Sequence, residues 1–136
     1  DDVVTPSQMA YEPVPDCDVT MPIFRSKVFN DPVHGHFRIR GECVKVIDTP
    51  EFQRLRDIKQ LGTSYFVFPG ACHNRFEHSL GVCKLAEEMV IRLQRGNANI
   101  GGNREKLNIS NNDVKLVAVA GLCHDLGHAP FSHVFD

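Results

Sequence analysis

The sequence predicts a mainly α-helical domain preceded by a short β-hairpin. Apolar residues recur every three or four positions in three segments, which is the spacing of helices with one buried face. Before them, two short stretches alternate polar and apolar residues on either side of a turn. The chain of 136 residues is 42% hydrophobic and 24% charged, which is typical of globular proteins. This length accommodates one small domain, or part of a larger one.

The hairpin is expected to pair residues 27–30 with residues 37–40, because both stretches alternate and the residues from Asp31-Pro32 to Gly35 are typical of turns. Residues 1–22 contain four prolines and no periodic apolar pattern. We therefore expect an extended or disordered arm there, ahead of a folded region that starts near residue 23.

The first helix is expected over residues 49–61. Thr49 is a suitable N-cap, Pro50 suits the first helical position, and Gly62 is expected to end the helix. An apolar loop closed by a Pro-Gly turn is expected to follow over residues 65–74.

The second helix is expected to begin near Asn74 and to end at Gly96, with Glu87 on its polar face. Its predicted apolar stripe comprises Phe76, Leu80, Cys83, Ala86, Val90 and Leu93. A glycine- and asparagine-rich loop is expected over residues 95–108. Ser110 and Asp113 then resemble a capping box that opens a third, buried helix, and Pro130 is expected to start a last helical turn.

Composition excludes several functional classes. The formal net charge is −2, from 15 Lys and Arg against 17 Asp and Glu, which gives no global attraction to nucleic acid or anionic lipid. No apolar run is long enough to span a membrane, and the N-terminus lacks the pattern of a signal peptide. The five cysteines include no Cys-x-x-Cys pair and are expected to be reduced thiols used for packing. We expect a nuclear or cytosolic protein that is not secreted.

Three residues are candidates for a metal site. His124 and Asp125 are adjacent near the end of the third predicted helix, where side chains about 100° apart can straddle one ion. His78 lies early in the second helix. Two imidazoles and a carboxylate suit zinc, iron, manganese or nickel, with magnesium as a further candidate. Burying polar residues without partners in an otherwise apolar helix is costly. Their presence there therefore favours a functional interpretation.

The other polar residues can be interpreted either as functional or as ordinary surface and structural residues. His128 follows His124 by one helical turn and, with His133, is a candidate to bind or protonate a phosphate. Arg75 either clamps a phosphate or forms a salt bridge with Glu77 or Glu51. The histidines His34, His36 and His73 are more typical of ordinary surface or half-buried positions. Arg54, Arg56 and Lys59 are more typical of a solvated face.

Two motifs carry a resemblance to a known family. Asn74-Arg75-Phe76-Glu77-His78-Ser79-Leu80-Gly81 and the run from His124-Asp125 to Ser132-His133 resemble the HD-domain deoxynucleoside triphosphate (dNTP) triphosphohydrolases. With residues 25–32 and 48–56 included, the chain is similar to the vertebrate branch that carries a SAM and an HD domain. The resemblance covers residues 21–136. It implies a helical HD core, of which residues 23–136 are the N-terminal portion.

The resemblance implies hydrolysis of dNTPs to deoxynucleoside and triphosphate, with a role in antiviral defence. It implies that His78, His124 and Asp125 hold the metal, that Arg75, His128 and His133 are catalytic and bind phosphate, and that Gln60 and Leu61 face the deoxyribose. It also implies two activator sites: one for GTP or dGTP at Lys27, Val28, Asp48, Gln53 and Arg56, and one for a dNTP at Asn30 and Val67. In the family, nucleotide binding at these sites assembles dimers into a homotetramer.

The chain departs from the family pattern in three respects. The family's fourth metal ligand, an aspartate, would lie downstream of Asp136, and no SAM domain precedes the arm. The stretch from Gly96 to Leu107 is longer than usual. We therefore expect the chain alone to be inactive. Two alternatives stay open: an HD-type nucleotide phosphodiesterase or nucleotidase, and a non-catalytic, truncated isoform that binds nucleotide or single-stranded nucleic acid.

Overall fold

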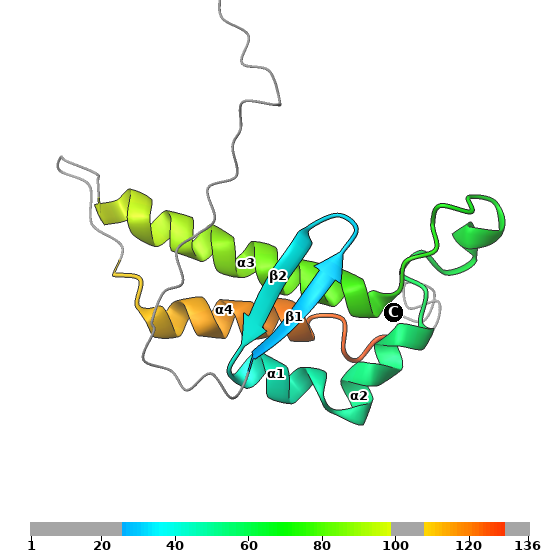
Figure 1. Ribbon diagram of the computed structural model, residues 1–136, viewed down its shortest axis with the longest axis horizontal. Coiled ribbons are helices and arrows are strands. Elements are labelled where there is room, and N and C mark those ends of the chain that lie inside the picture. Colours follow the sequence, from blue (N-terminus) through cyan, green and yellow to red (C-terminus); the bar gives the residue numbers. More distant parts are fainter. Residues whose placement is uncertain (1–25, 99–107, 130–136) are drawn as a thin grey trace, which may run out of the picture.

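The computed structural model describes residues 26–98 and 108–129, and it confirms a mainly helical fold that begins with a β-hairpin (Figure 1). The elements are, in order, β1 (Ser26–Asp31), β2 (Gly35–Arg40), α1 (Glu42–Ile47), α2 (Pro50–Gln53), the 3-10 helices η2 (Arg54–Asp57) and η3 (Gly62–Phe66), α3 (Arg75–Ala98) and α4 (Asn111–Cys123).

The predicted hairpin is confirmed and is slightly longer than expected. β1 and β2 are antiparallel, with Phe29 opposite Phe37. The Asp31 carboxylate accepts hydrogen bonds from the backbone N–H groups of Val33 and His34, both at 2.8 Å. Gly35 adopts φ +67°, a left-handed conformation that glycine tolerates without strain. The turn residues therefore determine the register, as the sequence pattern indicated.

The prediction of one helix over residues 49–61 is wrong in length. Thr49 does cap α2, accepting a hydrogen bond from the Phe52 N–H, but the α-helix ends at Gln53 and η2 ends at Asp57. Ile58 is extended, and its carbonyl accepts a hydrogen bond from the Arg75 N–H at 2.8 Å. Gln60 N–H likewise donates to the His73 carbonyl at 3.0 Å. Pairing with a distant segment therefore replaces the last helical turn.

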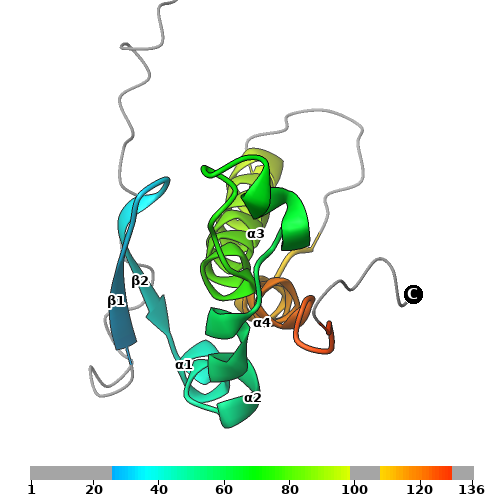
Figure 2. The same cartoon turned by 90° about the vertical axis from the view of Figure 1, so that its right-hand side faces the viewer.

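The helices α3 and α4 lie side by side, and the hairpin covers one flank of α3 (Figures 1 and 2). Gly121 makes close packing possible, since a Cβ there would lie 3.2 Å from the Ala86 Cβ. Contrary to prediction, α3 continues through Gly96 to Ala98. The capping box at the start of α4 is confirmed: Ser110 accepts from the Asp113 N–H, and Asp113 accepts from the Ser110 N–H.

The core joins the short elements to the two long helices. Phe52, Leu55 and Leu122 are fully buried, and Phe76 packs edge-on against Phe52 with ring centroids 5.4 Å apart. Other members of the core are Ile39, Cys43, Val44, Ile47, Ile58, Leu80, Cys83 and Ala118. The unpredicted helix α1 contributes three of them. This core fixes the starts of α2 and α3 and the end of α4 relative to one another.

The apolar stripe of α3 also differs from the prediction in its second half. Ile91 is buried, whereas Leu93 is about half exposed. Glu87 lies on the partly buried side, and burial raises the pKa of its carboxyl, with Arg40 opposing that shift. Ala86 and Val90 of the predicted stripe are half-buried, but the i, i+4 row from Cys83 through Glu87 leads to the buried Ile91 and not to Leu93.

Several predictions lie outside the described residues: the arm of residues 1–22, most of the loop before Asn108, the last helical turn after Pro130, and His133. Within the described ranges, the helices are too short or too polar to traverse a lipid bilayer.

Candidate metal centre

His78, His124 and Asp125 converge at one end of the α3–α4 pair. His78 is in the first turn of α3, His124 is the C-cap of α4, and Asp125 follows it in a turn. The two imidazole Nε2 atoms are 3.2 Å apart. From His124 Nε2 to Asp125 Oδ1 the distance is 3.3 Å, and from His78 Nε2 to Asp125 Oδ2 it is 3.7 Å. The structure therefore brings together the residues that the sequence proposed as metal ligands.

This spacing fits a divalent cation. Ligand atoms on a tetrahedral ion with bonds near 2.1 Å stand about 3.4 Å from one another, close to the 3.2 Å between the two imidazole nitrogens. One ligand atom from each of the three residues lies within 4.8 Å of the others. Two imidazole nitrogens that face each other at 3.2 Å need a proton or a cation between them to offset the repulsion of their lone pairs. The donor set of two nitrogens and one carboxylate suits a transition metal.

The surroundings prepare both imidazoles for metal binding. His124 Nδ1 lies 2.7 Å from the Gly121 carbonyl oxygen, an arrangement in which Nδ1–H donates and Nε2 keeps its lone pair. Burial lowers the pKa of His78, with smaller contributions in the same direction from His124, His73 and Arg75, while Asp125 opposes them. A neutral His78 at neutral pH has the protonation state that a ligand needs.

Asp125 is buried beside Arg75, whose Nη1 donates to Asp125 Oδ2 at 2.6 Å. The salt bridge predicted for Arg75 with Glu77 or Glu51 is thus replaced by one with a candidate metal ligand. Glu77 instead accepts a hydrogen bond from the Asn74 N–H at 2.7 Å, which caps α3. The two carboxylate oxygens of Asp125 have different neighbours: Oδ2 binds the guanidinium and lies nearer His78, whereas Oδ1 faces His124 and His128.

His128 approaches the same carboxylate. Its ring Nε2 lies 3.5 Å from Asp125 Oδ1. Its backbone N–H donates to the Asp125 carbonyl at 3.2 Å within the turn after α4. This turn, rather than a continuous helix, places His128 beside the candidate metal ligands His78, His124 and Asp125, here called the metal group. His124, Asp125 and His128 therefore face one small volume.

The residues proposed to face the deoxyribose lie on the strand-like segment before η3. Gln60 has a buried side-chain oxygen with no hydrogen-bond partner among the described residues, whereas Leu61 is about half exposed. A buried amide oxygen without a partner is costly, so a donor from a ligand would be favourable there.

Four of the residues proposed for the guanine-nucleotide site are linked in space near α1 and α2. Lys27 forms an ion pair with Asp48, the C-cap of α1. Gln53 donates to the Ile47 carbonyl at 2.7 Å and accepts from Arg56 Nε at 2.8 Å. The remaining proposed activator residues are Val28, Asn30 and Val67, all of which are exposed. The loop after η3 that contains Val67 projects away from the hairpin (Figure 1).

Arg54 is exposed, as expected for a solvated face, and it also makes a long-range contact. Its Nη2 donates to the His128 carbonyl oxygen at 2.9 Å, across 74 residues of sequence. No periodicity or local motif signals this contact, because its two ends are set by the packing of different elements. The stacking of Arg56 on Phe76, with Cζ 3.5 Å from the ring centroid, was missed for the same reason.

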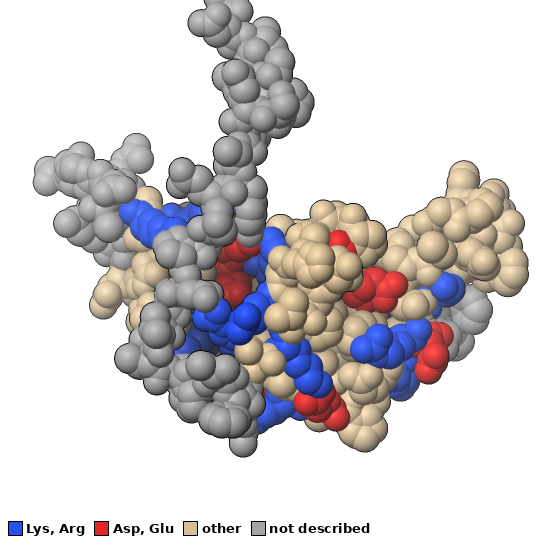
Figure 3. Space-filling view, in the orientation of Figure 1, with Lys and Arg blue, Asp and Glu red and all other residues tan. Residues whose placement is uncertain are grey.

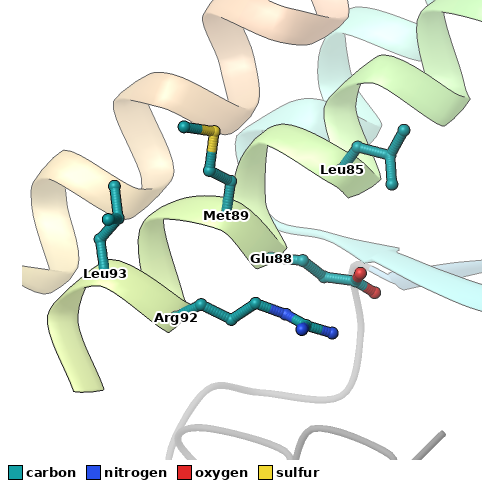
Figure 4. Close-up of a pocket in the computed structure, with 5 residues that line it drawn as sticks. All are labelled: Leu85, Glu88, Met89, Arg92 and Leu93. Carbon is teal, nitrogen blue, oxygen red and sulfur yellow. The ribbon is translucent and has the colours of Figure 1, made fainter. Parts of the chain in front are cut away.

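Two surface features lie apart from this centre. A shallow pocket on the outer side of α3 is lined by Leu85, Glu88, Met89, Arg92 and Leu93 (Figure 4). On the face in Figure 3, basic and acidic side chains of the described residues are interspersed. Ion pairs such as Lys84–Glu88 at 2.5 Å and Lys45–Glu42 at 2.6 Å account for part of this pattern.

The helical fold with its His–His–Asp group can be compared with known families. Residues 75–136, a little under half of the chain, match the HD domain family. The chain is 60% identical over 110 residues to "Deoxynucleoside triphosphate triphosphohydrolase SAMHD1" of Gallus gallus and 59% identical over 110 residues to the protein of that name in Homo sapiens. It is 49% identical over 111 residues to the SAMHD1 homolog of Dictyostelium discoideum.

These alignments cover 81% of this chain for the two vertebrate proteins and 82% for the Dictyostelium protein. They cover only 17%, 16% and 20% of the relatives themselves. The chain thus spans about a sixth of the length of its vertebrate relatives. The relatives are therefore much longer polypeptides than this chain.

Proposed function

We propose that this chain supplies the metal-binding part of a hydrolase that cleaves dNTPs to deoxynucleoside and triphosphate. The observation that carries the proposal is the convergence of His78, His124 and Asp125, with one ligand atom from each within 4.8 Å of the others. It is supported by 59% identity over 110 residues to a human protein named for this activity.

A divalent cation held by these three residues would supply Lewis-acid activation of water and polarisation of a phosphoryl oxygen. Zinc, iron, manganese and magnesium are the candidates. The protein's own groups act around it: Arg75 neutralises and orients the Asp125 carboxylate, and its positive charge also suits a substrate phosphate. His128, with its ring beside Asp125, is placed to bind or protonate a phosphate oxygen. We assign a similar role to His133, and contact with the sugar to Gln60 and Leu61.

We further propose that the linked residues Lys27, Asp48, Gln53 and Arg56 contribute to a guanine-nucleotide activator site, with Val28. Asn30 and Val67 would contribute to a second, dNTP site. Charged and amide groups held near one another at the surface suit the guanine edge and the phosphates of GTP or dGTP. Such sites would couple nucleotide binding to assembly of a homodimer and homotetramer in the longer polypeptide.

A nuclear or cytosolic location is proposed on chemical grounds. Within the described ranges, four cysteines are free thiols: Cys43, Cys72, Cys83 and Cys123. Free thiols are typical of proteins in reducing compartments.

The test is a chimera in which the 110 residues aligned with the human relative replace their counterparts there. The chimera should convert dGTP to deoxyguanosine and free triphosphate, and His124→Ala should abolish the reaction. His36→Ala is the matched control, because His36 is an exposed histidine on the hairpin. Stepwise release of monophosphate would instead indicate an HD-type nucleotidase. Nucleotide or single-strand binding without turnover would indicate a non-catalytic isoform.

A further inference from the structure

Arg54 connects two regions that the proposed function assigns to different tasks. It is the first residue of η2, and its Nη2 donates to the His128 carbonyl oxygen at 2.9 Å. The turn after α4 approaches the helical segment that follows α2 in Figure 1, consistent with this contact.

We propose that Arg54 is a positioning residue that holds the turn bearing His128 in place for catalysis and ties it to the segment bearing Gln53 and Arg56. The inference rests on the proposed function, since it assumes that His128 acts on a phosphate and that Gln53 and Arg56 contact an activator. Arg54 itself is not proposed to touch substrate or metal.

The base of the Arg54 side chain is firmly anchored. Leu55, the next residue, is fully buried, and so is Phe52, two residues before Arg54. Gln53 is tied to the Ile47 carbonyl, and Arg56 is tied to Gln53 and stacked on Phe76. The backbone of η2 therefore has little freedom to move independently, and its arginine can act as a fixed donor.

The acceptor of the Arg54 hydrogen bond is the His128 carbonyl oxygen, in the segment that follows α4. The His128 carbonyl lies beyond the end of α4 at Cys123, so no N–H group of that helix can serve as its donor. Within the turn, Leu126 N–H donates to the Cys123 carbonyl at 3.0 Å and His128 N–H donates to the Asp125 carbonyl at 3.2 Å. The Arg54 hydrogen bond fixes this turn from outside, at the residue whose imidazole lies 3.5 Å from Asp125.

Because η2 also carries Arg56 and follows Gln53, any shift of this segment on activator binding would be transmitted through Arg54 to the His128 carbonyl. The contact thus offers a short path, through one side chain, from the proposed activator residues to the proposed catalytic histidine.

The first test uses the 136-residue chain itself and does not require activity. Amide hydrogen exchange measured by NMR on Arg54→Met should show about tenfold faster exchange at Leu126 and His128, with exchange in the middle of α3 unchanged. Arg54→Lys, which keeps a donor and the charge, should restore most of the protection. Arg38→Met is the matched control, because Arg38 is an exposed arginine that bonds only within the hairpin in the described structure, to Ser26 Oγ at 3.4 Å.

The second test uses the chimera described above. Arg54→Met should lower kcat about tenfold while leaving the KM for dGTP and the half-saturating GTP concentration unchanged, and Arg54→Lys should recover most of kcat. Unchanged exchange at Leu126 and His128, or uniformly faster exchange throughout α3 and α4, would overturn the positioning role. A rise in KM with kcat unchanged would do the same. An inactive unaltered chimera would count against the proposed function alone, because the exchange measurement still decides the role of Arg54.

Discussion

Arg75 and Asp125 form a buried ion pair, with Nη1 and Oδ2 2.6 Å apart and side chains that are 4% and 7% exposed. The pair joins the first residue of α3 to the turn after α4, across 50 residues of sequence. It explains how a carboxylate can be buried beside two imidazoles before any cation binds. It also leaves Oδ1 directed toward His124 and His128. The guanidinium therefore orients the only carboxylate of the described metal group.

Removing the Arg75 guanidinium should destabilise the metal-free chain more than the metal-bound chain. Arg75→Met leaves the Asp125 carboxylate buried without its counter-charge, which should lower the free energy of unfolding by about 3–5 kcal/mol. A divalent cation would replace part of the lost positive charge, so manganese or cobalt should stabilise the variant more than the unaltered chain. Urea unfolding with and without the metal measures both effects.

The exposed Arg38 again provides the control, and Arg38→Met should change the unfolding free energy by less than about 0.5 kcal/mol. Equal losses for Arg75→Met with and without metal would contradict a shared role of arginine and cation at Asp125.

Glu87 gives the fold a pH dependence of known sign. Burial raises the pKa of its carboxyl, so the folded state holds this proton more tightly than the unfolded state does. Its contribution to stability is therefore greatest when the group is protonated in both states. This contribution is lost as pH rises from the unfolded pKa through the raised folded pKa. Glu87→Gln should remove that loss and be more stable than the unaltered chain at neutral pH, with the difference shrinking in acid.

Thermal unfolding of both proteins across the acidic to neutral range checks this sign. Glu88→Gln is the matched control, because Glu88 pairs with Lys84 at 2.5 Å and its neutralisation should instead cost up to about 0.5 kcal/mol. A stability difference between Glu87→Gln and the unaltered chain that is constant with pH would exclude the carboxyl as its source.

The sequence predicted most accurately the features that depend on residues close together in the chain. The hairpin turn depends on Asp31 and Gly35, and the start of α4 depends on Ser110 and Asp113, all within a few residues of the structure they produce. The metal group could be predicted for a related reason: His124 and Asp125 are adjacent, and the motif around His78 resembles a known family.

Contacts between distant segments could not be predicted. The helix over residues 49–61 ends early because the Ile58 carbonyl binds the Arg75 N–H, a partner that no local pattern reveals. The pairing of Arg75 with Asp125 depends equally on how α3 and α4 pack. The helix α1 was overlooked because its six residues are too few to show a helical period.

Thr49 should contribute to stability through two hydrogen bonds at the start of α2. Its Oγ1 accepts from the Phe52 N–H at 3.3 Å and donates to the Val46 carbonyl at 2.7 Å. Thr49→Ala removes both and should cost about 1 kcal/mol, while Thr49→Ser keeps the hydroxyl and should cost much less. Urea unfolding of the two variants compares them. Equal losses would show that the methyl group, rather than the cap, stabilises this segment.

Gly81 lets the hairpin pack closely against α3. A Cβ at this position would lie 2.9 Å from Nε2 of His34, a ring that also contacts Phe37 edge-on with centroids 6.2 Å apart. Gly81→Ala should therefore displace the His34 ring, at a cost of about 1–3 kcal/mol that exceeds the gain of about 1 kcal/mol in helix propensity.

His34→Ala removes the ring that a Cβ at Gly81 would meet. In that background, Gly81→Ala should become stabilising by about 0.5–1 kcal/mol, because only the gain in helix propensity remains. Urea unfolding of the two single variants and the double variant forms a double-mutant cycle whose interaction energy measures the clash directly. If Gly81→Ala has the same effect with and without His34, the hairpin does not rest on α3 at this point.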